Sequence, residues 1–226
     1  MGAFLESQAL TSHSILGRAS EGPFVTISRE SGTDVPGLAK MLAERLGGET
    51  DNSHSWAVFD ENLIEAMLQA SQLSPLIASY LPEGSVFEID ALVGEILGLH
   101  PNLWGLIQKT DRLTRELARK GGAIFVGRGA VFSTSGVANG VHVRLVAPQE
   151  HRARRTAERF NISLDAAAAY NKQQNAAHRA YVKKIFNARG PDPIAYDLVI
   201  NTARVPLLEA AGLITSVVHA LTPASV

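Results

Sequence analysis

The sequence predicts one α/β domain in which a parallel sheet is covered by helices on both faces. Short apolar runs of strand length alternate along the chain with segments whose apolar residues repeat at helical spacing. The runs are almost continuously apolar, which is typical of strands buried on both faces. With 226 residues and 46% hydrophobic residues, the chain is long enough to bury one substantial core.

The first half of the chain predicts two strand–helix units. Residues 24–28 form an apolar, β-rich run, and a loop containing glycine follows them. Helical spacing then repeats from residue 38 to residue 46, where Gly47-Gly48 ends the pattern. Residues 56–59 predict a short second strand, and Asp60 is suited to cap a helix that reaches residue 67.

The second half predicts three further strands among longer helices. Prolines and a glycine interrupt the helical spacing between residues 73 and 120, so several helices with irregular joints are expected there. Later expected elements are strands at 123–126, 141–146 and 198–200, a basic helix at 148–160, a long helix from Ser163 to about residue 187 and a C-terminal helix. Residues 1–22 are expected to be an N-terminal extension, and residues 23–226 the domain.

Composition narrows the classes of function. The net charge of -1 and the pI near 6.7 argue against binding nucleic acid or membrane through overall charge. The chain has no cysteine, so disulfides and thiolate chemistry are excluded. Its apolar stretches are shorter than the roughly 20 residues that a membrane span needs, and its start lacks the apolar run of a signal peptide. We expect a cytoplasmic protein.

The turn after the first predicted strand is a candidate phosphate site. It consists of Ser28, Arg29, Glu30, Ser31, Gly32, Thr33, Asp34 and Val35. Backbone N–H groups and a helix N-terminus in such a turn attract anions. The Walker A pattern is not satisfied, because Val35 stands where lysine is expected and Asp34 where glycine is expected. The alternative is an ordinary turn in which Asp34 caps the helix and Pro36 lies in its first turn.

Arginines form two further candidate sites. Arg128 lies between two glycines after the third predicted strand, where it would face a phosphate or a base edge, unless it is an exposed side chain in a flexible loop. Arg152, Arg155 and Arg159 share one helix face, and Arg154 is placed to pair with Glu150.

The following long helix carries a second cationic stripe. This stripe comprises Lys172, Arg179 and Lys183, near Asn175 and His178. The two basic helices form a hairpin suited to close over polyphosphate as a lid, or they present two solvated faces. RNA binding is disfavoured because few aromatic residues accompany the charges. The chain contains no HExxH metal motif and no GxSxG nucleophile elbow.

Several short segments together resemble the cytidylate kinase-like family of P-loop nucleoside monophosphate kinases. The resemblance runs from Phe24 to about Leu213. The segments that carry it are Thr26-Ile27-Ser28-Arg29-Glu30 with Gly32, Phe59-Asp60, Val126-Gly127-Arg128-Gly129-Ala130, Val143-Arg144-Leu145-Val146-Ala147-Pro148 with Arg152, and Tyr196-Asp197-Leu198-Val199-Ile200-Asn201-Thr202. It implies a P-loop kinase-like three-layer sandwich with a five-stranded parallel sheet, an acceptor region at about 60–115 and a helical lid at about 148–187. It also implies ATP as phosphate donor with Mg²⁺, and a small-molecule nucleotide as ligand.

The resemblance also suggests roles for individual residues. Residues 28–35 would hold the donor phosphates, and Arg128, with Asp60, would face the acceptor. Arg128 would also be catalytic, together with Arg152, Arg155 and, on the second lid helix, Arg179, since phosphoryl transfer needs mainly positioning and charge neutralisation. No metal ligand is assigned.

The sequence departs from this family at the phosphate loop. Val35 and Pro36 fill the positions of the lysine and the Mg²⁺-binding hydroxyl, and the Asp34 carboxylate could occupy its own anion site. Two hypotheses follow. The chain is an ATP-dependent nucleoside monophosphate kinase in which Arg29 or a lid arginine replaces the lysine, or it is a catalytically impaired relative that binds a nucleotide or phosphorylated metabolite in a regulatory role.

Overall fold

The computed structural model describes residues 22–48, 56–60, 103–127, 129–188 and 192–221. Arg128, the expected extension at 1–22 apart from its last residue, the helix expected after Asp60 and most of the expected acceptor region lie outside the described residues.

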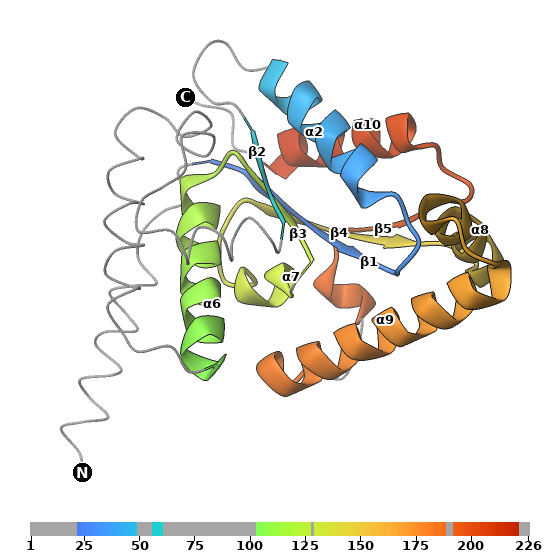
Figure 1. Ribbon diagram of the computed structural model, residues 1–226. Coiled ribbons are helices and arrows are strands. Elements are labelled where there is room, and N and C mark those ends of the chain that lie inside the picture. The colour runs from blue at the N-terminus through green and yellow to red at the C-terminus, as the bar shows by residue number, and fades with distance from the viewer. Residues whose placement is uncertain (1–21, 49–55, 61–102, 128, 189–191, 222–226) are drawn as a thin grey trace.

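Five parallel strands form the centre of the molecule (Figure 1). They are β1 (Phe24–Arg29), β2 (Ala57–Phe59), β3 (Ala123–Val126), β4 (Gly140–Val146) and β5 (Leu198–Asn201). Their order across the sheet is β2-β3-β1-β4-β5, so β1 lies between β3 and β4. The strand positions and the parallel sheet predicted from the apolar runs are confirmed.

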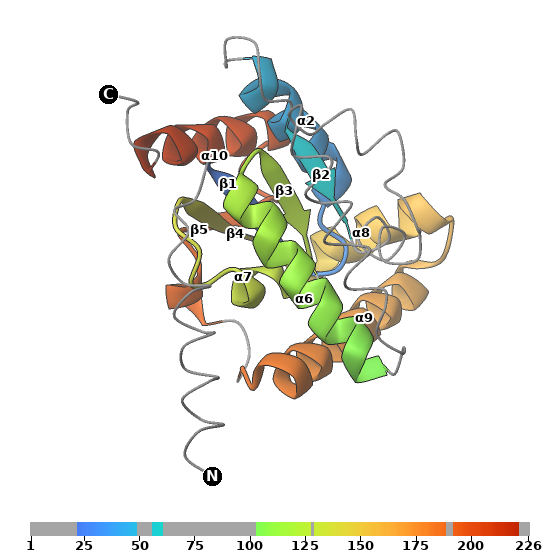
Figure 2. The ribbon, with the colours of Figure 1, turned by 90° about the vertical axis from the view of Figure 1, so that its left-hand side faces the viewer.

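Helices cover both faces of this sheet. On one face α2 (Val35–Gly48) packs against α10 (Leu207–Leu221), and on the other α6 (Leu103–Lys120) and the short α7 (Ala130–Ser133) contact β3 and β1 (Figures 1 and 2). α8 (Gln149–Phe160) and α9 (Leu164–Phe186) pack against each other beyond the carboxyl ends of the strands (Figure 1). A 3-10 turn, η1 (Pro193–Ala195), precedes β5. The three-layer α/β fold is confirmed.

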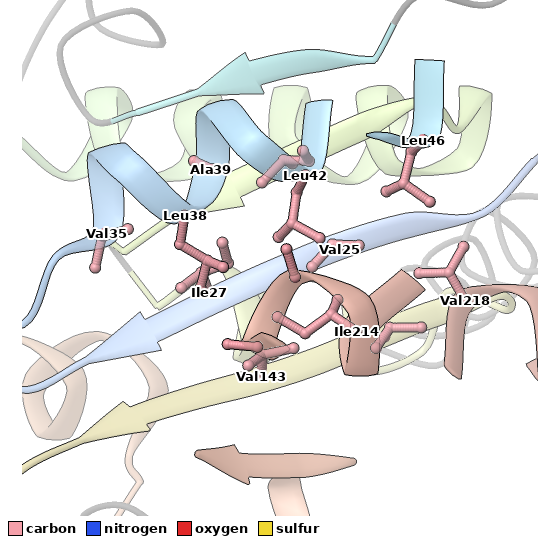
Figure 3. Packing of buried hydrophobic residues seen from close by; sticks show 14 of the residues in the cluster. Val25, Ile27, Val35, Leu38, Ala39, Leu42, Leu46, Val143, Ile214 and Val218 are labelled. Atoms are coloured by element: carbon pink, nitrogen blue, oxygen red, sulfur yellow. The ribbon is translucent and has the colours of Figure 1, made fainter. Parts of the chain in front are cut away.

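The main core lies between the sheet and the α2–α10 layer (Figure 3). Leu38, Leu42 and Leu46 follow one another at the four-residue spacing of a helix, so they form a single stripe that faces β1 and β4. Ile214 and Val218 of α10 complete this cluster. Burying each such side chain is worth about 1.5–3 kcal/mol, so this stripe fixes α2 and the loop that precedes it.

One local element was not expected from the sequence. The segment between β3 and β4 contains α7, which begins after Gly129 in the left-handed conformation at φ 74°. A Cβ at Gly129 would lie 2.4 Å from the ring of Phe186 at the end of α9, so this position requires glycine. α6 is one of the several helices expected between residues 73 and 120, and the rest of that region lies outside the described residues. Within the described residues, none of the helices is long and apolar enough to cross a bilayer.

Candidate functional site

The candidate site begins in the turn between β1 and α2. Gly32 adopts φ 92°, a conformation that side chains other than glycine rarely adopt. A Cβ at Gly32 would lie 2.6 Å from the backbone oxygen of Arg152 and 2.9 Å from Nδ2 of Asn171. The turn is therefore in direct contact with both α8 and α9.

Two asparagines of α9 hold Ser31. The backbone N–H of Ser31 donates to Oδ1 of Asn175 at 2.8 Å, and its hydroxyl donates to Oδ1 of Asn171 at 2.8 Å. Asn171 is 1% exposed and also accepts from the hydroxyl of Thr156 in α8 at 2.9 Å. Its buried Nδ2 has no hydrogen-bond partner among the described residues. These contacts join both basic helices to the turn through one polar network.

Arg152 is buried and binds the same turn from α8. Its guanidinium donates to the backbone oxygens of Ala147 at 2.9 Å and Ser31 at 3.0 Å, and lies 3.3 Å from Oε2 of Glu30. That Glu30 oxygen also accepts from the backbone N–H of Ala147 at 3.3 Å. Buried charges are stable when they are paired and hydrogen-bonded, and this guanidinium has a carboxylate beside it and two backbone acceptors. In this structure Arg152 fixes the turn against β4.

Asp34 lies where a bound phosphate would meet the α2 N-terminus. Its Oδ1 accepts from the backbone N–H of Gly37 in the first turn at 3.2 Å, and its Oδ2 lies 2.8 Å from the guanidinium of Arg155. Pro36 lies in that first turn, as the alternative of a capped helix predicted. A carboxylate here uses a helix donor and a cation that an anionic ligand would otherwise use.

A second group of polar side chains surrounds Ser28 at the end of β1. Its hydroxyl lies 3.4 Å from the guanidinium of Arg144 in β4 and 3.3 Å from the hydroxyl of Tyr196. The Arg144 guanidinium also lies 5.7 Å from the centre of the Tyr196 ring. On the β3 side, the Arg29 guanidinium contacts Gly127, where a Cβ would lie 1.9 Å from its nitrogen.

The other predicted site residues differ in whether they contact the turn. The hydroxyl of Thr33 donates to the backbone oxygen of Glu30 at 2.9 Å, and Val35 is buried in the core. Asp60 is exposed at the end of β2. Arg179 is exposed on α9 and makes no hydrogen bond or ion pair with a described residue. The structure thus joins Arg152 and Arg155 to the turn, whereas among the described residues no hydrogen bond or ion pair joins Arg179 to it.

Sequence reasoning missed the roles of Asn171, Arg144 and Tyr196. Asn171 and Asn175 share a face of α9 at four-residue spacing, but nothing in that spacing identifies Ser31 as their partner. Arg144 interrupts an apolar strand with a charge, and this signal was available in the sequence.

His142 belongs to the same strand face as Arg144. Its Nδ1 lies 2.8 Å from the hydroxyl of Thr26, and its backbone N–H donates to Asp197 at 2.6 Å. Burial lowers the pKa of His142, and the nearby Asp197 carboxylate opposes that shift without reversing it. The neutral imidazole is therefore favoured in the folded protein.

The side chains around the turn limit which of the groups implied by the resemblance, phosphate and Mg²⁺, can bind there. Among the described residues no cluster of three or more acidic or histidine side chains is suited to hold a metal. A phosphate bound at the turn would meet Arg155 and the N-terminus of α2. Asp34 contacts both of these groups in this structure. It fits a phosphate once that carboxylate moves away, and a Mg²⁺ ion would be held mainly by the phosphates themselves.

Comparison with known proteins places these features in context. A model of the cytidylate kinase-like family matches residues 24–204. A cytidylate kinase from Methanocaldococcus jannaschii is 28% identical over 116 residues, which are 50% of this chain and 65% of that protein. A cytidylate kinase from Methanopyrus kandleri is 32% identical over 102 residues, which are 42% of this chain and 53% of that protein. The chain thus spans less than two thirds of the length of either relative.

A solved structure shares the fold. The crystal structure of an uncharacterized protein from Eubacterium ventriosum superposes with a TM-score of 0.64 at 16% identity, covering 88% of this chain and 99% of that one.

Proposed function

The chain belongs to the cytidylate kinase-like family, and from that premise we propose that it is an ATP-dependent phosphotransferase acting on a nucleoside monophosphate. The observation that carries the proposal is the ion pair of Arg155 with Asp34 beside the turn held by Arg152. It places an arginine at the α2 N-terminus, where donor phosphates would lie. The altered loop is then a degenerate Walker A turn in which arginine supplies the missing cation.

In the proposed resting state, side chains of the protein itself occupy the groups that would bind the donor phosphates. Asp34 neutralises Arg155 and accepts from the N–H of Gly37 in α2, while Asn175 accepts from the N–H of Ser31 in the turn. ATP binding would exchange the Asp34 carboxylate for a phosphate and free Arg155 to neutralise charge on the transferred group. Bound Mg²⁺ would contribute further charge neutralisation. Arg152 would keep the turn in position throughout, because its contacts are to the backbone and to Glu30.

A second candidate function is favoured by the same donors. If Asp34 and Asn175 keep their hydrogen bonds to the backbone N–H groups when a ligand binds, those N–H groups cannot bind the donor phosphates and catalysis fails. The chain would then bind a nucleotide or phosphorylated metabolite through other groups and act as a regulatory relative.

The two candidates are separated by an ADP-release assay with ATP, Mg²⁺ and CMP, UMP, AMP or GMP in turn. A kinase gives turnover with at least one acceptor, and Asp34→Gly should raise ATP affinity several-fold because it removes the competing carboxylate. Arg154→Gln is the matched control, since Arg154 lies on the same helix as Arg155 and, among the described residues, pairs only with exposed Glu150. No turnover above background with any acceptor would remove the kinase proposal.

Calorimetry with ATP and CMP then tests the regulatory candidate. Binding without turnover would support it, and the absence of binding by every nucleotide would exclude it.

A further inference from the structure

Ser28 and Arg144 are register partners at the carboxyl ends of β1 and β4. The connection after β1 runs through α2 to β2 at one edge of the sheet, whereas that after β4 runs through α8 and α9 to β5 at the other edge (Figure 1). Adjacent strands whose connections leave in opposite directions define the topological switch point, where ligands bind in open parallel sheets. Arg144 therefore lies at the switch point, on a rigid strand.

The part of the chain that the structure describes leaves Arg144 with unused hydrogen-bonding capacity. Its guanidinium is partly buried, and within the described residues its contacts are the 3.4 Å approach to the Ser28 hydroxyl and the Tyr196 ring. Nearby carboxylates are used elsewhere: Asp197 accepts from His142, and Glu30 pairs with Arg152. A guanidinium carries five N–H donors, and a partly buried one without an acidic partner is costly unless a ligand supplies the anion.

Tyr196 and Ser28 orient this guanidinium. The aromatic ring contacts it from one side, and the Ser28 hydroxyl contacts both Arg144 and the Tyr196 hydroxyl. A planar guanidinium held in this way keeps its remaining N–H groups available for paired hydrogen bonds to phosphate oxygens. Tyr196 and Arg144 are both partly exposed, so a small ligand can reach them.

We propose that Arg144, with Ser28 and Tyr196, binds the phosphate group of the acceptor. The inference deepens the proposed function and rests on it, because only that function makes the bound phosphate compound a phosphoryl acceptor. The chemistry of the site itself requires only a small phosphate monoester. This subsite is separate from the α2 N-terminus, where Arg155 and Asp34 lie.

Calorimetry on the full chain with CMP, cytidine and inorganic phosphate tests the assignment. The wild type should bind CMP at least about tenfold more tightly than cytidine, because a charge-assisted pair of hydrogen bonds is worth that much. Arg144→Gln should abolish this preference, and Arg144→Lys should retain part of it, since lysine keeps the charge but not the paired donors. Arg154→Gln should match the wild type. Circular dichroism checks that each variant is folded.

Each outcome decides the proposal. A wild type that does not prefer CMP over cytidine overturns it, as does an Arg144→Gln variant whose preference stays within twofold of the wild type. If Arg144→Gln does not fold, an unchanged preference in Arg144→Lys overturns it instead. Binding of inorganic phosphate that is lost in Arg144→Gln supports it. If CMP binding depends on Arg144 but no turnover occurs, this inference stands and the kinase proposal fails. If turnover occurs but Arg144→Gln binds CMP as tightly as the wild type, the kinase proposal stands and this inference fails.

Discussion

The turn after β1 and the switch point beside it are built in opposite ways. Both α8 arginines that reach the turn have a carboxylate partner there, Glu30 for Arg152 and Asp34 for Arg155, and asparagines accept from Ser31. At the switch point Arg144 has only hydroxyl and aromatic neighbours among the described residues. A cation paired within the protein fixes structure until a ligand displaces its partner, whereas a cation without an acidic partner is directly available to a ligand. Substitutions in the turn should therefore reduce stability, and those at Arg144 should reduce binding.

The largest expected effect is at Gly32. Gly32→Ala should lower the free energy of unfolding by about 2–3 kcal/mol, because alanine is strained at φ 92° and its Cβ would meet the Arg152 backbone. Urea denaturation measures this. Gly48→Ala is the control, since a Cβ there meets nothing within 4 Å. Equal stability of the two variants would contradict the close contact of α8 with the turn.

The buried asparagine should have the next largest effect. Asn171→Ala should cost about 2 kcal/mol, because the hydroxyls of Ser31 and Thr156 would lose their shared acceptor. Gln174→Ala, at an exposed position of the same helix, should change stability by less than about 0.5 kcal/mol. If both variants unfold at the same urea concentration as the wild type, the network does not hold α9 on the turn.

The Asp34–Arg155 pair should contribute less. A double-mutant cycle with Asp34→Asn and Arg155→Gln should give a coupling of about 0.5 kcal/mol that falls with added salt, because both side chains are partly exposed. The more exposed Glu150–Arg154 pair, measured in the same way, should couple more weakly. A stronger coupling for that surface pair would show that Asp34 and Arg155 do not interact as described.

The smallest effect concerns pH and His142. Because its folded pKa is lowered, the unfolded chain takes up this proton first as pH falls through the ordinary value of 6.5. The stability that His142 contributes is therefore complete above that pH and is lost as pH falls towards the folded pKa. His142→Gln, which keeps a hydrogen-bonding partner for Thr26, should flatten the stability profile over this interval. An unchanged slope in urea titrations would rule out the lowered pKa as a source of acid sensitivity.

Much of the fold was predictable because it depends on local pattern. The apolar runs predicted all five strands, and the Ser163 cap predicted the start of α9, where its hydroxyl accepts from Ala166. The expected Glu150–Arg154 pair is also present. The site was predicted less completely. Arg152 and Arg155 reach the turn, but the predicted lid and catalytic roles stay predictions.

The sequence by itself determined the α/β class, the parallel sheet and the polar turn after β1, since hydrophobic periodicity and capping are properties of neighbouring residues. Only the tertiary structure decided which polar groups meet. Ser31 and Asn171 are separated by 140 positions in the chain, and Ser28 and Arg144 by 116. Their contacts follow from the strand order and the packing of α9, and neither of these is encoded in a local stretch of residues.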